Sequence, residues 1–427
     1  MQFSFFKKYR NSTLIKDSAI YAFGAFFQKG IAYFLIPLYF GVLLPTEYGE
    51  LNIFTTLISI LSIFSSCGLA QVYYSEFYHY QGEGKKELVR NIITSYIIFA
   101  LPVFFIFFIL FIIFGETLLH FKTSLLITTL VFLISFLMFF QSIFFASLRL
   151  SGKSIKFITI NISTGILFLV TNIILVYYLR IGILGIFISN FIVAFIIAFV
   201  AGFNYYKIIG KFHFHLNETT KYYLKLGFPF IFSSLSYWLV NYANIWIINQ
   251  MLSQKDVGIY TAAYKFAQIY DPLIIAPLLS AFTPYLFKRL SEKNYNTKFR
   301  LYIPVILMLF GMLIFISLFF AKLSTKLAAT ENYNASFTLI PCLVMSFGFI
   351  FIAQMTGGVL IFYKKTRQLT INIAISGVIN ILLTVLLVHF YRLQGSAIAN
   401  VISNAIWAFL TLYQSKLQIT RVIKDQQ

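Results

Sequence analysis

Long apolar segments recur along the whole chain, separated by short polar connections. Each is long enough to cross about 30 Å of hydrocarbon as an α-helix. No connection is long enough to fold as a separate domain. The pattern therefore predicts an all-α polytopic membrane protein that acts within or between its helices. The predicted membrane-spanning segments are residues 18–44, 51–77, 91–114, 123–148, 157–179, 183–206, 226–250, 257–287, 301–321, 335–362, 368–390 and 395–415.

The composition supports this fold class. Of the 427 residues, 59% are hydrophobic and 11% are charged. A soluble domain carries about 25% charged residues, so this chain lacks the polar surface to face water on all sides. No removable signal peptide is expected at the N-terminus. Cys67 and Cys342 lie in separate spans, and neither a disulfide nor a metal site is expected from them.

Lysine and arginine fall unevenly on the two sides of the predicted membrane. Counted on alternate sides of the twelve spans, 25 lie on one side and six on the other, while Lys29 and Lys265 lie inside spans. The positive-inside rule places the basic side, and with it both termini, in the cytoplasm. The net charge of +20 then reflects orientation and contact with anionic headgroups, and no nucleic-acid partner is expected.

The two halves of the chain resemble each other. The stretch "LLPTEYGEL" (43–51) matches "LSQKDVGIY" (252–260) and aligns Gly49 with Gly258. Two further pairs match at offsets of 210 to 212 residues: "GKSIKFITINISTG" (152–165) with "KKTRQLTINIAISG" (364–377), and "YLRIGILGIFISN" (178–190) with "FYRLQGSAIAN" (390–400). Six spans per repeat give both halves the same orientation, with a site expected at their interface. The predicted division is an N-lobe at 1–206, a cytoplasmic connection at 207–225 and a C-lobe at 226–427.

Two segments carry a family resemblance. "LLPTEYGELNIF" (43–54) leads into the second span, and "LKLGFPFIFSSLSYWLVNYANIWIINQMLSQKDVGIYTAAYKF" (224–266) covers the seventh and enters the eighth. With them the chain resembles polysaccharide flippases of the Wzx type. These belong to the MOP superfamily, which also contains the MATE drug antiporters and the lipid II flippases.

The resemblance implies twelve helices in two six-helix lobes that work by alternating access in the bacterial cytoplasmic (inner) membrane. The implied cargo is an oligosaccharide linked to undecaprenyl diphosphate, such as an O-antigen (lipopolysaccharide) or capsule unit. It would move from the cytoplasmic to the periplasmic leaflet. Membrane lipids, a polysaccharide polymerase and a chain-length regulator are further candidate partners. Many members carry an Asp-Arg pair in the seventh span where this chain has Ala243-Asn244, so no role of that pair is transferred here.

Polar side chains repeat at helical spacing in several spans. Span seven carries Tyr237, Asn241 and Asn244, and span eight carries Tyr260, Tyr264, Gln268 and Asp271, with similar stripes in spans five, eleven and twelve. Such stripes join membrane helices by hydrogen bonds, or they face a wet cavity in which amides and aromatic rings bind sugar. The predicted substrate-binding residues from these stripes are Asn241, Asn244, Tyr264 and Gln268.

Charged residues inside spans are the other functional candidates, because each costs roughly 2.5–3.5 kcal/mol in hydrocarbon. We predict that Lys29 and Lys265 attract the diphosphate of the carrier lipid. The alternatives are snorkelling of Lys29 to the headgroups and a structural pair of Lys265 with Asp271. Asp271 and Glu76 are candidate coupling or gating carboxylates for H⁺ or Na⁺. No cofactor is expected.

Two other functions remain open from the sequence. A MATE-type drug antiporter would favour an acidic cavity, whereas this chain has two embedded lysines. A membrane polysaccharide polymerase or glycosyltransferase would place acids or arginines in a long outer loop, and the outer loops here are short and poor in both. No catalytic residues are therefore assigned, and the chain is predicted not to be an enzyme.

Overall fold

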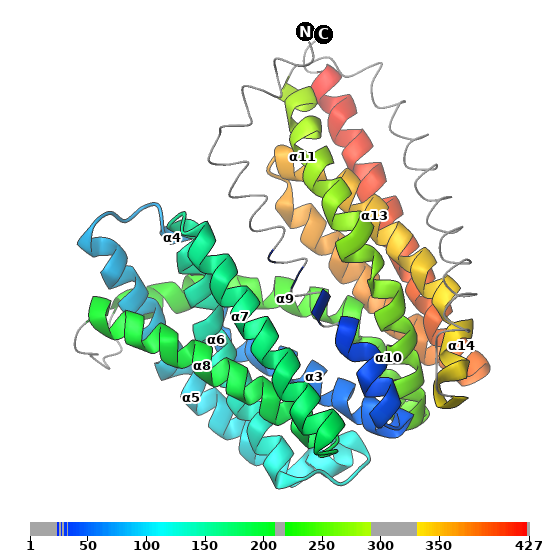
Figure 1. Ribbon diagram of the computed structural model, residues 1–427. Helices are drawn as coiled ribbons and strands as arrows, with labels where there is room; N and C mark the ends of the chain where they lie inside the picture. The colour runs from blue at the N-terminus through cyan, green and yellow to red at the C-terminus, as the bar shows by residue number, and fades with distance from the viewer. Residues whose placement is uncertain are drawn as a thin grey trace. The chain divides into compact units, whose positions relative to one another are not determined.

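A computed structural model of the chain describes residues 24, 27, 30, 31, 33–209, 218–291 and 331–424. Lys29 and the ninth predicted span (301–321) lie outside the described residues. The chain forms two compact units, whose elements are labelled in Figure 1. Unit 1 comprises the residues up to 43 together with 54–234, and unit 2 comprises 44–53 together with 235 onwards. The predicted lobe division at 206 and 226 stays a prediction.

Unit 1 is a bundle of long helices, in which α6, α7 and α8 pack on one another and α4 packs on α5 and α6 (Figure 1). Several of its helices are separated by residues with positive φ, such as Cys67 and Gly68 between α3 and α4. The elements are α3 (Pro45–Ser66) from residue 54 on, α4 (Leu69–Glu76), α5 (Glu83–Leu119), α6 (Leu125–Leu150), α7 (Ser154–Asn172) with its π-helical extension η1 (Ile173–Tyr178), α8 (Ile183–Ile209) and the first half of α9 (Glu218–Met251).

Unit 2 is built around α13, which packs on α10, α11 and α14. The α14 helix is interrupted at Arg392, whose φ of 51° and ψ of −132° are not helical, so it is two helices joined by a kink. The elements after α9 are α10 (Gln254–Gln268), the π-helical turn η2 (Asp271–Ile275), α11 (Ala276–Ser291), the 3₁₀ helix η3 (Glu331–Thr338), α13 (Ile340–Phe362) and α14 (Thr366–Lys424).

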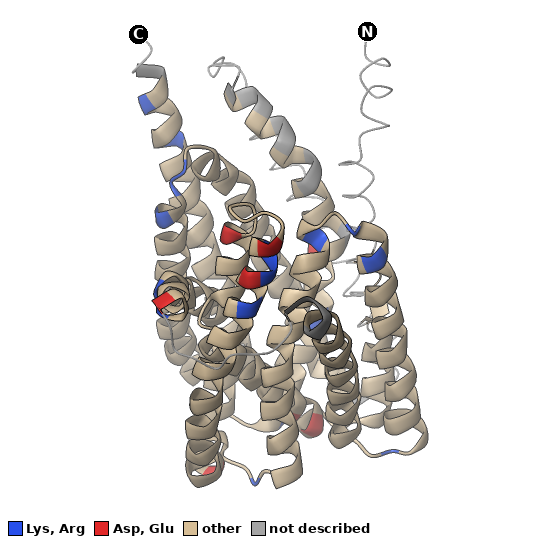
Figure 2. Cartoon of the chain, turned by 90° about the vertical axis from the view of Figure 1, so that its left-hand side faces the viewer, with Lys and Arg blue, Asp and Glu red and all other residues tan. Residues whose placement is uncertain are grey.

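The described helices follow the predicted hydrophobic segments. Seven of them are long and apolar enough to cross a membrane: α3, α5, α6, α7 with η1, α8, α13 and α14. Helix α9 and the α10–α11 pair, which carry the polar stripes of spans seven and eight, are not among these seven. The fold is thus all-helical over the described ranges, and the count of twelve spans and the side of the termini stay predictions. Figure 2 shows long uncharged stretches, with lysines, arginines and acids mainly near helix ends and in connections.

The duplication predicted from sequence is visible in local conformation. Arg180 and Arg392, which the repeat aligns, both have a φ of 51° at the turn between two helices. After each turn a glycine packs closely against the preceding helix: Gly185 against Leu175, and Gly395 against Leu387. A side chain would not fit in that second contact, because a Cβ on Gly395 would meet the carbonyl oxygen of Leu387. The same turn is therefore built twice.

A reciprocal contact joins the first turns of α3 and α10 inside unit 2. A Cβ on Gly49 would fall against the carbonyl oxygen of Gln254, and a Cβ on Gly258 would fall against that of Pro45. Residues 45 and 49 are the repeat counterparts of 254 and 258, each at an offset of 209. Such exchange of equivalent contacts is the signature of a two-fold relation between two segments. Only glycine permits this approach of two backbones.

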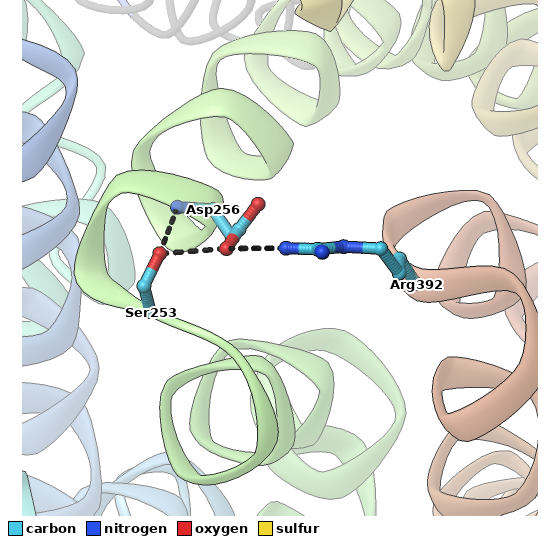
Figure 3. Close-up of polar contacts among 3 residues, drawn as sticks. All are labelled: Ser253, Asp256 and Arg392. Carbon is cyan, nitrogen blue, oxygen red and sulfur yellow. Dashed lines mark hydrogen bonds and ion pairs between the residues drawn. The ribbon is translucent and has the colours of Figure 1, made fainter.

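The N-terminus of α10 is capped by its own residues and approached by a distant arginine (Figure 3). Ser253 Oγ accepts a hydrogen bond from the Asp256 backbone N–H at 3.2 Å and donates one to the Asp256 carboxylate at 2.6 Å. Arg392, from the kink of α14, lies 3.7 Å from the same carboxylate. The turn between the two halves of α14 is thereby joined to the start of α10.

Of the two interactions at this end, the cap should matter more. Ser253→Ala removes an N-cap and is expected to lower the free energy of unfolding by about 0.5–2 kcal/mol. The Arg392 side chain is 73% exposed, so Arg392→Ala should cost no more than about 1 kcal/mol. Thermal unfolding of both variants in the same detergent checks the order. A larger loss for Arg392→Ala would show that the ion pair is the main contact.

Candidate functional site

Half-buried polar side chains of α9 and α10 meet in unit 2. The Tyr264 hydroxyl donates a hydrogen bond to Asn241 Oδ1 at 3.3 Å, and Asn241 Nδ2 donates to the Tyr237 carbonyl at 2.7 Å. Tyr237, one turn before Asn241, is 53% exposed. The structure therefore brings together two predicted substrate-binding residues, Asn241 and Tyr264, beside an exposed aromatic ring.

Lys265 follows directly on α10 and is also half-buried. Its Nζ lies 3.4 Å from Gln268 Oε1, one turn along the same helix. The α-helix α10 ends at Gln268, and the π-helical turn η2 begins three residues later with Asp271-Pro272. Lys265 and Gln268, both predicted to bind substrate, thus form a donor–acceptor pair, whereas the alternative of a structural Lys265–Asp271 pair is not the contact seen.

These four residues, Asn241, Tyr264, Lys265 and Gln268, are called the α9–α10 polar face from here on. The face offers one cation, two side-chain amides and one aromatic ring, each partly accessible. A cation binds phosphate as a point charge, and amides satisfy both donors and acceptors of sugar hydroxyls. This chemistry fits a ligand that carries both phosphate and sugar.

Asn244 has a different environment. It is buried, with Nδ2 donating to the Tyr260 hydroxyl at 3.0 Å and Oδ1 accepting from Thr384 Oγ1 at 3.1 Å. Asn400 Nδ2 also donates to the Tyr260 hydroxyl, at 3.2 Å. Asn244 therefore joins α9, α10 and α14 in this conformation. Its assignment to substrate binding stays a prediction that this arrangement does not favour.

The stripes of spans eleven and twelve are buried as well. Asn400 Oδ1 accepts from Ser346 Oγ at 2.8 Å and from Asn404 Nδ2 at 2.6 Å, and Asn380 Nδ2 donates to Ser403 Oγ at 2.9 Å. Asn372 and Gln414 exchange two bonds of 3.0 Å. These polar residues join the two halves of α14 to each other and to α13, as expected for helix contacts in a membrane. Sequence reasoning did not single out Ser346 or Asn404, although Asn404 follows Asn400 by one turn.

The remaining candidates lie elsewhere. Glu76 is the last residue of α4 in unit 1 and is partly exposed, and Asp271 is partly exposed in unit 2. Their coupling roles stay predictions, as does the role of Lys29. Within the part of the chain that the structure describes, no group of three or more His, Cys, Asp or Glu side chains is arranged to hold a metal ion. Cys67 and Cys342 are both free thiols.

Comparison with known proteins identifies the family. A sequence profile described as "Polysaccharide biosynthesis protein" matches residues 14–290, well over half of the chain. The chain belongs to this polysaccharide biosynthesis family. A relative in sequence is an uncharacterized membrane protein of Haemophilus influenzae, 24% identical over 294 residues, which cover 67% of this chain and 68% of that protein.

Solved structures of the MOP superfamily share the fold of this family member. An inward closed conformation of the lipid II flippase MurJ aligns with a TM-score of 0.73, at 16% identity, over 94% of this chain and 87% of that one. An inward-facing multidrug MATE transporter aligns with a TM-score of 0.69, also at 16% identity, over 93% and 96%. A Vibrio cholerae MATE transporter aligns at 0.59. At these identities the likeness establishes the fold alone.

The family and the fold confirm the coarser predictions. The chain is a multi-pass membrane protein of the polysaccharide biosynthesis family with a MOP-type fold. The prediction that it is not an enzyme agrees with its structural relatives, which are drug transporters and a lipid flippase.

Proposed function

We propose that the protein is a flippase for an oligosaccharide linked to undecaprenyl diphosphate, an O-antigen or capsule repeat unit, in the bacterial cytoplasmic membrane. The observation that carries the proposal is the family match over residues 14–290, together with a fold shared with a lipid II flippase. The cargo moves from the cytoplasmic to the periplasmic leaflet by alternating access of two six-helix lobes, with both termini in the cytoplasm.

The α9–α10 polar face supplies the cargo contacts in this proposal. Lys265 attracts the diphosphate, while Gln268 and Asn241 hydrogen-bond to sugar hydroxyls and Tyr264 covers an apolar sugar face. Lys29 adds a second cation from the first span. The prenyl tail stays in lipid, because its burial in a polar site would forfeit about 0.8 kcal/mol for each CH₂ withdrawn from hydrocarbon.

Energy for transport comes from a coupling ion in this proposal, H⁺ or Na⁺, with Asp271 and Glu76 as candidate carboxylates. No organic cofactor takes part. A polysaccharide polymerase and a chain-length regulator would receive the product at the outer leaflet.

A second candidate is a MATE-type drug antiporter, favoured by the alignment with a multidrug MATE transporter over 96% of its length. The two functions differ in the sign of the cargo charge. An antiporter of cationic drugs would gain from loss of Lys265, because removal of the positive charge removes repulsion. The flippase would lose activity.

Replacement of Lys265 separates these alternatives. In a strain that lacks the gene and is complemented by the full chain, Lys265→Met is expected to reduce surface polysaccharide about tenfold, since a charge-assisted contact is worth roughly 1.5–3 kcal/mol. Lipid-linked oligosaccharide should accumulate in the cytoplasmic leaflet. Surface polysaccharide and leaflet-specific labelling of the glycan are measured at equal protein level.

Two variants complete the design. Lys265→Arg keeps the charge and should retain most export. Lys221→Met serves as the matched control, because Lys221 is exposed and already paired with Glu218 at 2.9 Å. Normal export by Lys265→Met would show that Lys265 does not contribute to cargo binding. Normal polysaccharide in the deletion strain itself, with raised drug sensitivity, would favour the antiporter.

A further inference from the structure

The end of α4 in unit 1 carries a group of aromatic rings. Tyr78 is 69% exposed and Tyr74 is 39% exposed, while Phe77 between them is buried and makes an edge contact with Tyr78 at 5.3 Å. The charge asymmetry of the sequence places this end of the helix on the cytoplasmic side. At such an end we expect exposed tyrosines at the level of the lipid headgroups, where aromatic rings are enriched.

Two cations lie over these rings. Lys85 Nζ is 4.3 Å from the centroid of Phe77 and 6.0 Å from that of Tyr78. The guanidinium carbon of Arg149, at the end of α6, is 5.3 Å from the Phe157 ring and 6.0 Å from the Tyr74 ring. These distances fall in the range of cation–π attraction. The rings at the end of α4 therefore contact one cation from α5 and one from α6.

Neighbouring cations of unit 1 are paired with carboxylates instead. Lys86 contacts Glu83 at 2.6 Å, and Arg90 contacts Glu87 at 3.8 Å. Over the described ranges, by contrast, neither Lys85 nor Arg149 has an acidic partner. Arg149 Nε donates a hydrogen bond to the Phe145 carbonyl at 3.4 Å. Within the part of the chain that the structure describes, neither cation is therefore neutralised by a carboxylate.

The fold does not require a cation at position 149. The repeat aligns the turn after α6, at Gly152-Lys153, with Lys364-Lys365 after α13, and at this offset of 212 Arg149 corresponds to Ile361. The second copy of the turn therefore forms with an isoleucine in that place. A residue that only one repeat needs is a candidate for recognition rather than for folding.

We propose that Lys85, Arg149 and the rings of Tyr74, Phe77, Tyr78 and Phe157 form a reception site for the diphosphate of the lipid-linked glycan at the cytoplasmic surface. This inference rests on the proposed flippase function and deepens it. A guanidinium stacked on a ring keeps donors free for two parallel bonds to phosphate, and the lysine adds a point charge. The exposed rings of Tyr74 and Tyr78 accept the first sugar. The site, named the α4 cation–aromatic cluster, would collect cargo before translocation.

Binding of defined lipids to the purified full chain tests the site. The protein is placed in phosphatidylcholine nanodiscs and titrated with undecaprenyl diphosphate or, separately, with phosphatidylglycerol. The double variant Lys85→Gln/Arg149→Gln is expected to bind undecaprenyl diphosphate about tenfold more weakly or worse, as two charge-assisted contacts are lost. The affinity of Arg149→Lys for undecaprenyl diphosphate should lie between those of the wild type and the double variant. Lysine keeps the positive charge but cannot make the two parallel hydrogen bonds of a guanidinium.

The matched control is Lys86→Gln/Arg90→Gln, which removes the same charge from the same side and should change binding less than about twofold. Unchanged binding of undecaprenyl diphosphate by the Lys85/Arg149 variant overturns the site and leaves the flippase proposal standing. Equal losses in the two double variants, or an equal loss for phosphatidylglycerol, also overturn it, since the effect would then be unspecific. Wild-type protein without preference for undecaprenyl diphosphate would contradict the proposed function itself.

Discussion

Gly49→Ala is expected to destabilise the protein by about 3 kcal/mol or more, a loss at the upper end of overpacking effects. The added Cβ would fall against the carbonyl oxygen of Gln254, on the backbone of α10. A backbone atom cannot rotate away as a side chain can, so the two helices must move apart. Gly258→Ala should have the same effect, because its Cβ would meet Pro45 in the reciprocal contact. Thermal unfolding in detergent measures both losses.

Gly202→Ala in α8 is the control for this prediction. A Cβ at Gly202 meets no atom within 4 Å. Alanine also favours a helix over glycine by about 1 kcal/mol, so this variant should unfold at the same or a higher temperature. If Gly49→Ala unfolded at the same temperature as Gly202→Ala, the close approach of α3 and α10 would not exist in the folded protein.

Asn400→Leu should lower the free energy of unfolding by about 2 kcal/mol. Its side chain makes three hydrogen bonds, to Tyr260, Ser346 and Asn404, and bonds of this kind in membrane proteins average about 0.6 kcal/mol each. Leucine has a similar volume, so the loss reports mainly the polar contacts. Unfolding of unit 2 is followed by the temperature dependence of circular dichroism.

The repeat supplies a matched control for Asn400. Asn190 is its counterpart in the first half, and among the described residues Asn190 Nδ2 donates only to the Ile186 carbonyl of its own helix, at 3.1 Å. Asn190→Leu should therefore change stability by less than about 0.5 kcal/mol, as for substitutions away from buried networks. Equal losses for the two variants would mean that the Asn400 bonds contribute no net stability.

The sequence was sufficient to predict the helices, because the length of an apolar segment shows directly whether it can cross a membrane as a helix. It was also sufficient to locate the polar stripes, since the helical period does not depend on tertiary structure. It could not decide what a stripe faces. Asn241 and Asn244 lie one turn apart on α9, yet Asn241 is half-exposed and Asn244 is buried against Thr384. In a membrane the same amide suits a wet site or a helix contact, so only the packing separates the two.

Contacts between distant segments were beyond the sequence for another reason. Tyr74, Lys85 and Arg149 belong to three different helices, and no spacing within the chain relates them. The match of Gly49 with Gly258 revealed that the halves are copies, yet it gave no sign that the two copies touch. Equivalence in sequence says where a residue stands in its own repeat, whereas contact depends on how the repeats pack.

The exchange of segments between the two units bears on the order in which the protein is made. Residues 44–53 pack in unit 2, whereas residues 218–234 of α9 pack in unit 1. Segment 44–53 is synthesised about 200 residues ahead of α10, which at roughly 5–20 residues per second means a wait of about 10–40 s for its partner. Unit 1 in turn stays incomplete until the start of the second repeat has been inserted. The first repeat therefore cannot finish folding as it is translated, whereas the second finds its partner segment already in the membrane.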